Sequence, residues 1–315
     1  QLPALPANCY LLRRRAAPNY SAYLKIAEGC DNHCAYCLIP QLRGHYCSRP
    51  MEDILEEAAN LAAEGIKELI VVAQDTTNYG RDIYGKRCLP MLLEKLAQLP
   101  IPMIRILYLY PSDVEEDLLQ VMAAHDNICN YLDIPIQHGD NVILAAMNRR
   151  GTKELFVEKI AMIRRYLPDV MLRTTVIVGF PGETADNFAN LLDFLQQARF
   201  DWVGAFPYFQ EDDTPAAIFD GQVPPEIKQS RLDQVMEQAA QITAEKLAQW
   251  PGRMVSVLAE DTAVTADGCY EGRSYGQAPE VDGVIYFSGA NVRPGDLVRV
   301  RISAAETFDL WGEMI

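Results

Sequence analysis

Six short apolar or β-branched runs alternate with helical patterns through the first two thirds of this 315-residue chain. The runs lie at residues 23–27, 68–73, 103–108, 131–136, 174–179 and 202–208. Helical patterns lie between them, at residues 50–65, 90–99, 113–125, 153–166 and 184–198. Alternating strands and helices are typical of βαβ units with a parallel sheet. Six units, rather than the eight of a closed barrel, predict a partial (β/α)6 barrel that is open on one side.

The pattern changes after Tyr208. An acidic, proline-rich segment at residues 211–225 predicts a loop, and residues 226–249 predict a long helix. Beyond residue 252 the chain consists of short strand patterns separated by turn signals, which favours a small all-β barrel. We therefore expect a linker at residues 1–18, a core domain at residues 19–248 and a β-barrel domain at residues 249–315.

Three cysteines follow the first predicted strand with the spacing C-x3-C-x2-C: Cys30, Cys34 and Cys37. Iron–sulfur cubes normally take four cysteine ligands. Three thiolates on one short loop could hold three irons of a 4Fe–4S cube and leave the fourth iron open to another ligand. Ligands in α/β barrels gather beyond the carboxyl ends of the strands, where this loop would lie.

A structural zinc site and a disulfide framework are the alternatives. Zinc would need a fourth ligand, which Cys47, His33 or His45 could supply. A disulfide framework is disfavoured because the chain has 8 Cys in 315 residues and no signal-peptide pattern. A reducing, cytoplasmic location is therefore expected. The sequence contains no apolar run long enough to predict a membrane span.

Several strand-end segments make the cysteine pattern more specific. Residues 28–37 read EGCDNHCAYC, residues 72–77 read VAQDTT, residues 131–138 read YLDIPIQH and residues 173–184 read RTTVIVGFPGET. Together they resemble the methylthiotransferase branch of the radical S-adenosylmethionine (radical SAM) enzymes. The C-terminal β-domain resembles the TRAM domain that ends those proteins. The resemblance covers nearly all of the chain.

Three strings resemble the type within that branch that modifies a ribosomal protein: KIAEGCDN at residues 25–32, AQDTT at 73–77 and LRTT at 172–175. The resemblance implies transfer of a methylthio group to the β-carbon of an aspartate in ribosomal small-subunit protein twelve. It implies a 4Fe–4S cluster on the three cysteines and S-adenosylmethionine on the open iron. Reductive cleavage of the sulfonium would give a 5′-deoxyadenosyl radical, so an electron donor is also implied.

The family implies a second 4Fe–4S cluster, held by three further cysteines in a domain before the core. Only Cys9 precedes the triplet here. We therefore expect the second cluster in the full-length protein only, and we interpret residues 1–18 as the linker from the missing domain. Four other cysteines are scattered, and we expect them to be small buried hydrophobic residues: Cys47, Cys88, Cys129 and Cys269.

The resemblance also suggests contacts to S-adenosylmethionine. Tyr36, directly before the third cysteine, would pack on or hydrogen-bond to the adenine side, although an ordinary core aromatic is the alternative. Asp75 and Thr76 follow the second predicted strand and would meet the ribose or the amino group. Their alternative role is helix capping, which Asp and Thr both perform well.

Two further candidate contacts and one candidate catalytic residue lie later in the chain. Gln137, at the end of the fourth predicted strand, is a candidate ribose contact. Arg149 could bind the cofactor carboxylate in a bidentate way, although a solvated helix end is an equal alternative. Arg173 is the candidate catalytic residue. Its charge would need a partner, either a substrate carboxylate or a structural acid such as Asp133.

The chain is acidic, with a formal net charge of −15 and a pI of about 4.7. Residues 249–315 contain five Arg, no Lys and ten Asp or Glu, a net charge of −5. A negative field repels phosphate backbones, and an RNA-binding domain should offer a basic face. We therefore favour a basic ribosomal protein over nucleic acid as the partner. A transfer-RNA methylthiotransferase and a zinc-bearing protein-binding scaffold remain the alternatives.

Overall fold

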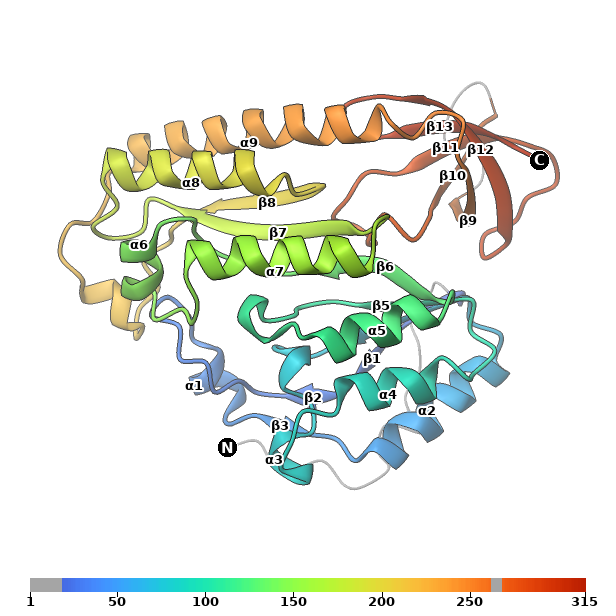
Figure 1. The fold of residues 1–315 in the computed structure, drawn as a ribbon, viewed down its shortest axis with the longest axis horizontal. Coiled ribbons are helices and arrows are strands. Elements are labelled where there is room, and N and C mark those ends of the chain that lie inside the picture. Colours follow the sequence, from blue (N-terminus) through green and yellow to red (C-terminus); the bar gives the residue numbers. More distant parts are fainter. Residues whose placement is uncertain (1–18, 262–267) are drawn as a thin grey trace.

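A six-stranded parallel sheet forms the centre of the larger domain (Figure 1). The computed structural model describes residues 19–261 and 268–315, so the predicted linker at residues 1–18 lies outside the described residues. The strand order is β1-β4-β5-β6-β7-β8, with every neighbouring pair parallel. The strands are β1 Ser21–Lys25, β4 Glu68–Val72, β5 Met103–Ile106, β6 Ile128–Asp133, β7 Met171–Val178 and β8 Trp202–Pro207. This open sheet in chain order confirms the predicted partial (β/α)6 barrel.

Helices connect the successive strands, and their buried faces pack against the sheet to form the hydrophobic core. Thr152 caps the helix after β6 through its side chain, and Thr184 and Asn187 form a capping box on the next one. β4 is buried on both faces, as expected for a parallel strand that helices cover. The connecting helices are α2 Met51–Ala63, α4 Leu89–Leu96, α5 Glu116–Ala124, α7 Lys153–Tyr166 and α8 Ala185–Ala198.

Short elements carry the loops at the carboxyl ends of the strands. The hairpin of β2 Ala27–Glu28 and β3 Cys47–Ser48 closes the base of the loop that holds the three cysteines. In Figure 1, α1 and α6 lie at the end of the sheet opposite the C-terminal barrel. The other short elements are α1 Ile39–Arg43, α3 Arg81–Tyr84, α6 Asn141–Ala146, and the 3₁₀ turns Thr76–Asn78, Pro111–Asp113 and Pro215–Ile218.

A small closed β-barrel follows the long helix α9 Pro225–Leu247. Its strand order is β10-β11-β13-β12-β9, which confirms the predicted all-β barrel. The sequence did not predict β13, which pairs in parallel with β11. The barrel begins at β9, so we retain Gln249 as the proposed domain boundary. The strands are β9 Met254–Asp261, β10 Tyr270–Arg273, β11 Ile285–Ser288, β12 Leu297–Ala305 and β13 Leu310–Met314.

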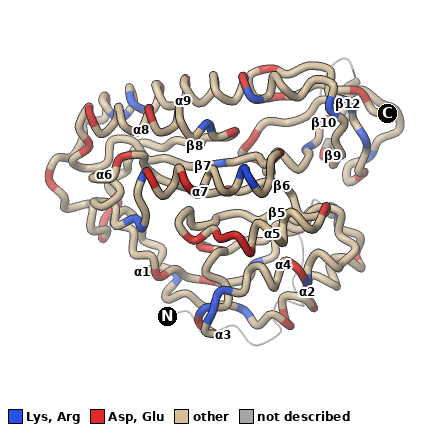
Figure 2. Tube along the Cα trace, viewed as in Figure 1, with Lys and Arg blue, Asp and Glu red and all other residues tan. Residues whose placement is uncertain are grey.

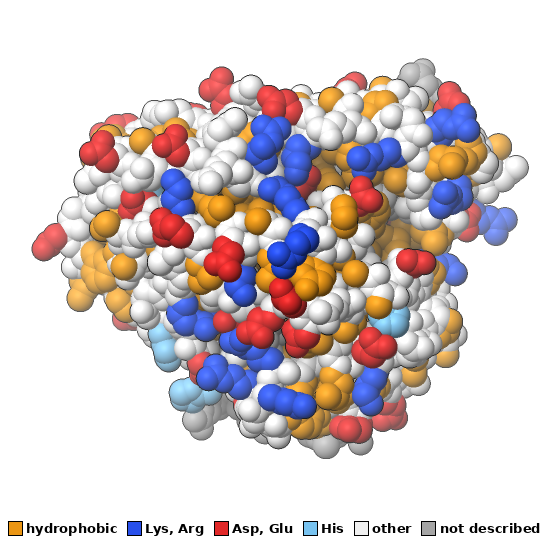
Figure 3. Space-filling model, in the orientation of Figure 1, with side chains coloured by type: hydrophobic (Ala, Val, Ile, Leu, Met, Phe, Trp, Pro, Cys, Tyr) orange, Lys and Arg blue, Asp and Glu red, His pale blue; other side chains and the backbone are white. Residues whose placement is uncertain are grey.

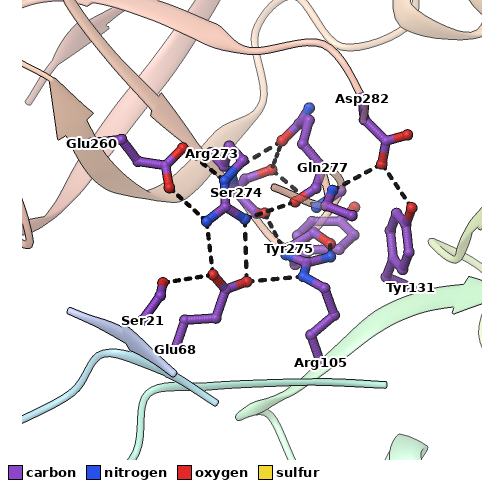
Figure 4. A network of polar contacts seen from close by, with 12 residues as sticks. Ser21, Glu68, Arg105, Tyr131, Glu260, Arg273, Ser274, Tyr275, Gln277 and Asp282 are labelled. Atoms are coloured by element: carbon purple, nitrogen blue, oxygen red, sulfur yellow. Dashed lines mark hydrogen bonds and ion pairs between the residues drawn. The ribbon is translucent and has the colours of Figure 1, made fainter. Parts of the chain in front are cut away.

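A buried ion-pair network joins this barrel to the parallel sheet (Figure 4). Glu68, the first residue of β4, is fully buried between two guanidinium groups. Arg105 Nε donates to Glu68 Oε1 over 2.9 Å, and Arg273 Nη2 from the barrel donates to Glu68 Oε2 over 2.7 Å. Arg105 also donates to the backbone carbonyls of Ser274 and Tyr275. The network fixes the barrel against the residues near the strand starts.

Charged residues of both signs are spread over both domains (Figure 2). On the face seen in Figure 3, Lys and Arg side chains are interspersed with Asp and Glu. Within the described parts of the chain, no helix combines the length and the apolar character needed to cross a bilayer.

Candidate functional site

Cys30, Cys34 and Cys37 line one cavity of about 380 Å³. They lie on the loop between β2 and α1, beyond the carboxyl end of β1. Gly29 gives this loop its shape, because its φ is +81° and an added Cβ would lie 2.2 Å from the backbone oxygen of His45. Only glycine tolerates both conditions. The sequence therefore places a glycine where the backbone of the loop lies close to the backbone of His45.

Each of the three thiol sulfurs accepts a contact from one N–H group. Cys30 Sγ receives Asn32 Nδ2 at 3.4 Å, and Cys37 Sγ receives its donor, the Ile39 backbone N–H, at 3.4 Å. Cys34 Sγ lies 3.7 Å from Arg149 Nη1. Burial raises the pKa of the Cys30 and Cys37 thiols. The donors oppose this effect, because hydrogen bonds to sulfur favour the thiolate that a metal requires.

The donor set fits an iron–sulfur cube better than a single metal ion. Among the described residues, no three His, Cys, Asp or Glu side chains come close enough to hold one ion. A cube takes one thiolate per iron, so its ligands surround the group rather than converge on one point. His45 and Cys47, which a zinc site could have used, are exposed, and His45 Nδ1 instead lies 2.9 Å from Asp31 Oδ1.

Asp75 lines the cavity and Thr76 does not. The Asp75 carboxylate is buried and accepts hydrogen bonds from Asn32 Nδ2, at 2.9 Å, and from the Thr77 hydroxyl. It makes no capping hydrogen bond to the 3₁₀ turn Thr76–Asn78 that follows. The Thr76 hydroxyl is fully buried and donates to the Leu107 carbonyl oxygen at 2.9 Å. The structure therefore turns the hydroxyl of Thr76 toward the neighbouring strand end and not toward the cavity.

Gln137 reaches the cavity through an unusual backbone conformation. Its φ is +72°, although it is not a glycine. Its backbone pairs with β7 on both sides, since its N–H donates to Thr175 O at 2.9 Å and its carbonyl accepts from Ile177 N at 2.8 Å. Such a conformation is costly and persists where the surrounding structure enforces it, often at functional sites.

Tyr36 and Arg149 also line the cavity. Burial, with Cys34 nearby, raises the pKa of the Tyr36 phenol well above its ordinary value. The Arg149 guanidinium stacks on the Tyr110 ring, 4.3 Å from its centroid, and donates to Pro135 O. Arg149 Nε is buried and has no hydrogen-bond partner. A buried cationic N–H without an acceptor on the cavity wall suits the carboxylate of a bound ligand.

Arg173 lies elsewhere. It stands near the start of β7, where its Nη1 is 3.2 Å from Asp133 Oδ1 and its Nε is 3.4 Å from Asp282 Oδ1 of the C-terminal barrel. It does not line the cysteine cavity. Of the two partners considered from the sequence, the structure supplies the structural acid Asp133. Its position gives no support to the prediction that Arg173 is catalytic.

Three residues of this region have a place in the site that their sequence positions did not predict: Asn32, Tyr108 and Tyr110. Asn32 joins the Cys30 sulfur to Asp75 and accepts Arg150 Nη2 at 2.9 Å. Tyr108 and Tyr110 line the cavity, and both follow the end of β5 at Ile106. The strand-end position of the two tyrosines was a usable signal. Of the four scattered cysteines, Cys88 and Cys129 are buried as expected. Cys269 is only partly buried, and Cys47 is exposed because it lies on the two-stranded hairpin, so the prediction was wrong for Cys47.

A partial parallel barrel with three cysteines on the loop after its first strand is the architecture of a radical SAM enzyme. The model of the radical SAM superfamily matches residues 24–195, and that of the TRAM domain matches residues 252–315. A radical S-adenosylmethionine methyltransferase, TsrM from Kitasatospora setae, has the same fold. The TM-score is 0.52 at 19% identity, covering 62% of this chain and 36% of that chain.

Relatives with higher sequence identity show which kind of radical SAM enzyme this chain resembles. The ribosomal protein uS12 methylthiotransferase RimO of Pelotomaculum thermopropionicum is 48% identical over 99% of this chain and 71% of its own length. That of Clostridioides difficile is 47% identical over 97% of this chain and 69% of its own length. The chain belongs to the RimO family of radical SAM methylthiotransferases. It spans about 70% of the length of these two relatives.

Proposed function

We propose that this enzyme adds a methylthio group to the β-carbon of an aspartate in ribosomal protein uS12 of the small subunit, in the cytoplasm. The observation that carries the proposal is the cavity lined by Cys30, Cys34 and Cys37 in a chain whose relatives bear the RimO name. The transfer-RNA alternative shares the same chemistry and differs in the target.

The residues of the cavity fall into two groups in this proposal. Cys30, Cys34 and Cys37 hold the 4Fe–4S cluster as thiolates. When bound, the cluster and S-adenosylmethionine supply one-electron cleavage of the sulfonium and removal of a hydrogen atom from carbon. The buried Arg149 Nε faces the cofactor carboxylate, as its lack of another acceptor suggests. Tyr36, Asp75 and Gln137 line the same cavity and contact the nucleoside or the amino group.

The charge distribution favours a protein substrate over transfer RNA. Residues 249–315 carry a net charge of −5. The Arg273 side chain is buried and donates its hydrogen bonds to Glu68 and Glu260, so it cannot bind a phosphate. RNA-binding domains need an exposed basic face, whereas an acidic domain complements a basic ribosomal protein.

Two further components belong to the proposal. An electron donor must reduce the 4Fe–4S cluster. A second 4Fe–4S cluster is proposed for the full-length protein only, because the RimO relatives extend well beyond the part that matches this chain.

Isotope transfer tests the proposed substrate. Ribosomal protein uS12 with deuterium on its aspartate β-carbons is incubated without oxygen with the cluster-loaded chain, S-adenosylmethionine and dithionite. We expect deuterium in the 5′-deoxyadenosine product, detected by mass spectrometry. Perdeuterated transfer RNA is the matched control and should give unlabelled product. Label from transfer RNA but not from uS12 would overturn the substrate assignment, and no 5′-deoxyadenosine at all would favour the zinc-bearing scaffold.

A further inference from the structure

Asn32 lies between the first two cysteines of the loop, and both ends of its side-chain amide have partners. Its Nδ2 donates to Cys30 Sγ over 3.4 Å and to Asp75 Oδ2 over 2.9 Å. Its Oδ1 accepts a hydrogen bond from Arg150 Nη2 over 2.9 Å. An asparagine amide offers two donor hydrogens and one carbonyl oxygen. Two ordinary polar contacts therefore hold the amide in the position from which it faces the sulfur.

The charged neighbours of Asn32 determine which end of its amide faces Cys30. A guanidinium has only donors, so Arg150 can bind the amide only through its carbonyl oxygen. The Asp75 carboxylate accepts hydrogen bonds, so it binds the NH2 group. Exchanging the amide nitrogen and oxygen would lose both contacts and would turn an oxygen toward the sulfur. The charges on either side therefore place an N–H group against Cys30 Sγ.

Both neighbours of Asn32 are held in place. Asp75 is 2% exposed. Arg150 pairs with Asp113 at 2.8 Å and lies over the Tyr110 ring, 4.3 Å from its centroid. A cation bound to the Asn32 carbonyl also polarises the amide, which makes its N–H groups stronger donors. Arg150 can thus affect the sulfur without touching it.

A hydrogen bond to a ligand sulfur affects the two oxidation states of an iron–sulfur cluster unequally. Reduction adds one electron from an external donor to the cluster, and no bond forms or breaks at Asn32. The reduced state is more negative, so an N–H group that faces a sulfur stabilises it more than the oxidised state. Hydrogen bonds to the sulfurs are accordingly among the factors that set the reduction potential.

We propose that Asn32 is a positioning residue that raises the reduction potential of the 4Fe–4S cluster through Cys30, and that Arg150 acts on this potential through Asn32. The inference deepens the proposed function and rests on it for the cluster. Ile39 contributes a backbone N–H, and Arg149 faces the proposed cofactor carboxylate, so this role falls to the Asn32 amide. A higher potential lets the electron donor reduce a larger fraction of the clusters.

Redox titration of the full 315-residue chain tests this inference. Iron and zinc are measured after anaerobic reconstitution. The reduction potential is then determined without S-adenosylmethionine, by dye-mediated titration followed by electron paramagnetic resonance. The variants are Asn32→Leu, which removes the amide and keeps a similar size, Arg150→Met, and the combination of the two.

Asn148→Gly is the control for disturbance of the loop. Asn148 Nδ2 donates to the His33 carbonyl oxygen over 2.8 Å, so it supports the same loop, and it makes no hydrogen bond to a sulfur of the described residues. Its φ is +53°, which glycine adopts readily. The control therefore removes an amide contact to the loop without removing a contact to a cysteine.

We expect Asn32→Leu to shift the equilibrium toward the oxidised state about tenfold, a fall of about 59 mV for a one-electron couple. Arg150→Met should lower the potential by less. The combined variant should match Asn32→Leu, because Arg150 has no effect once the amide is absent. Asn148→Gly should keep the wild-type potential.

A wild-type potential in Asn32→Leu with full iron would overturn the role of Asn32 and leave the proposed function standing. An equal fall in Asn148→Gly would also overturn it, and additive shifts in the combined variant would overturn the action of Arg150 through Asn32. Zinc in place of iron in the wild type would instead overturn the proposed function, and this inference with it.

Arg150→Met decides the question if Asn32→Leu takes up no iron. In about 1 M salt an exposed charge is screened beyond about 3 Å, whereas a hydrogen bond is retained. A fall in potential that persists at this salt concentration supports the inference. A potential equal to that of wild type under the same conditions overturns it.

Discussion

Asn32, Ile39 and Arg149 each direct one N–H group at a different thiol of the cysteine loop. Hydrogen-bond donors that face a sulfur favour its thiolate form over the neutral thiol. Three unrelated segments supply the donors: the loop itself, the start of α1 and the region after α6. A structural cysteine buried as a hydrophobic residue needs no such donors. The thiols are therefore prepared as ligands by the fold around them.

The first prediction concerns the three cysteines. The triple variant Cys30→Ala, Cys34→Ala, Cys37→Ala should lose its cluster, because each thiolate holds a different iron. Wild type should contain about four irons per chain after anaerobic reconstitution, as one cube requires. Iron, sulfide and zinc analysis measures this. Cys47→Ala, an exposed cysteine outside the cavity, should keep the wild-type content. One tightly held zinc and no stable iron would contradict the assignment.

The second prediction concerns Arg149. Arg149→Met keeps an unbranched side chain that can still pack against Tyr110, but it removes the guanidinium with its buried donor and its charge. Since hydrogen bonds to charged groups contribute about 1.5–3 kcal/mol, S-adenosylmethionine should bind the cluster-loaded variant about 10- to 100-fold more weakly. Calorimetric titration measures the dissociation constant.

Arg165→Met is a matched control for Arg149. Arg165 lies over the Tyr166 ring, 5.4 Å from its centroid, pairs with Glu116 at the surface and does not line the cavity. This variant should bind S-adenosylmethionine within about twofold of wild type, given the small effects of surface ion pairs. An unchanged dissociation constant in Arg149→Met would show that the cofactor carboxylate lies elsewhere.

Sequence patterns were informative at the residue scale where chemistry is local. The cysteine spacing and the polar residues after strand ends pointed to the cavity, and Cys30, Cys34, Cys37, Asp75 and Gln137 do line it. Thr76 and Arg173 show where prediction from sequence position fails. Thr76 follows a strand and Arg173 lies near the start of one, but a position relative to a strand does not reveal which neighbour the side chain will contact. Thr76 donates to Leu107 O and Arg173 pairs with Asp133, and these contacts exist only once the sheet is packed.

At the scale of elements, the two ends of the cysteine loop are joined by a short hairpin that the pattern of apolar residues does not predict. β2 and β3 contain two residues each, too few for an alternating pattern. The sequence did not predict strand β13 for another reason. β13 pairs in parallel with β11 and antiparallel with β12, and local turn signals do not reveal a parallel pairing. The six core strands and α7, in contrast, were predicted because long runs with a clear period are reliable signals.

The third prediction tests the close approach within this loop. Gly29→Ala should displace the loop, because its φ is +81° and the added Cβ would meet His45 O at 2.2 Å. Iron content after reconstitution should fall well below wild type. Gly65→Ala is the matched control, with φ of +84° but nothing within 4 Å of the added Cβ. It should cost about 1 kcal/mol of stability and keep its iron. Full iron loading of Gly29→Ala would contradict this role for the glycine.

At the scale of the whole molecule, a buried ion-pair network holds the two domains together. Glu68 and Arg105 come from the sheet, and Arg273 and Glu260 come from the C-terminal barrel. Breaking such a buried network is strongly destabilising because it leaves an uncompensated charge. Sequence patterns gave no sign of it, since the partners lie about two hundred positions apart and look like ordinary surface charges until the barrel covers them.

The fourth prediction concerns the stability of this junction. Burial alone would raise the pKa of Glu68, but the Arg105 and Arg273 guanidiniums overcome that effect and lower it from 4.5 to about 2. A lowered pKa means that the carboxylate stabilises the fold above pH 4.5 and loses this contribution as the pH falls toward 2. At one pKa unit per 1.36 kcal/mol, the contribution at neutral pH is about 3 kcal/mol.

Glu68→Gln should therefore be less stable than wild type at pH 7 by about 3–5 kcal/mol, and the gap should narrow by about 2 kcal/mol at pH 3. Urea unfolding followed by tryptophan fluorescence measures both values, since Trp202 and Trp250 are buried at the junction. Glu237→Gln, an exposed acid on α9, should match wild type at both values of pH. A gap of the same size at pH 7 and pH 3 would show that Glu68 acts through packing rather than through its charge, and the two domains would then be held together mainly by the apolar contacts around Trp202 and Trp250.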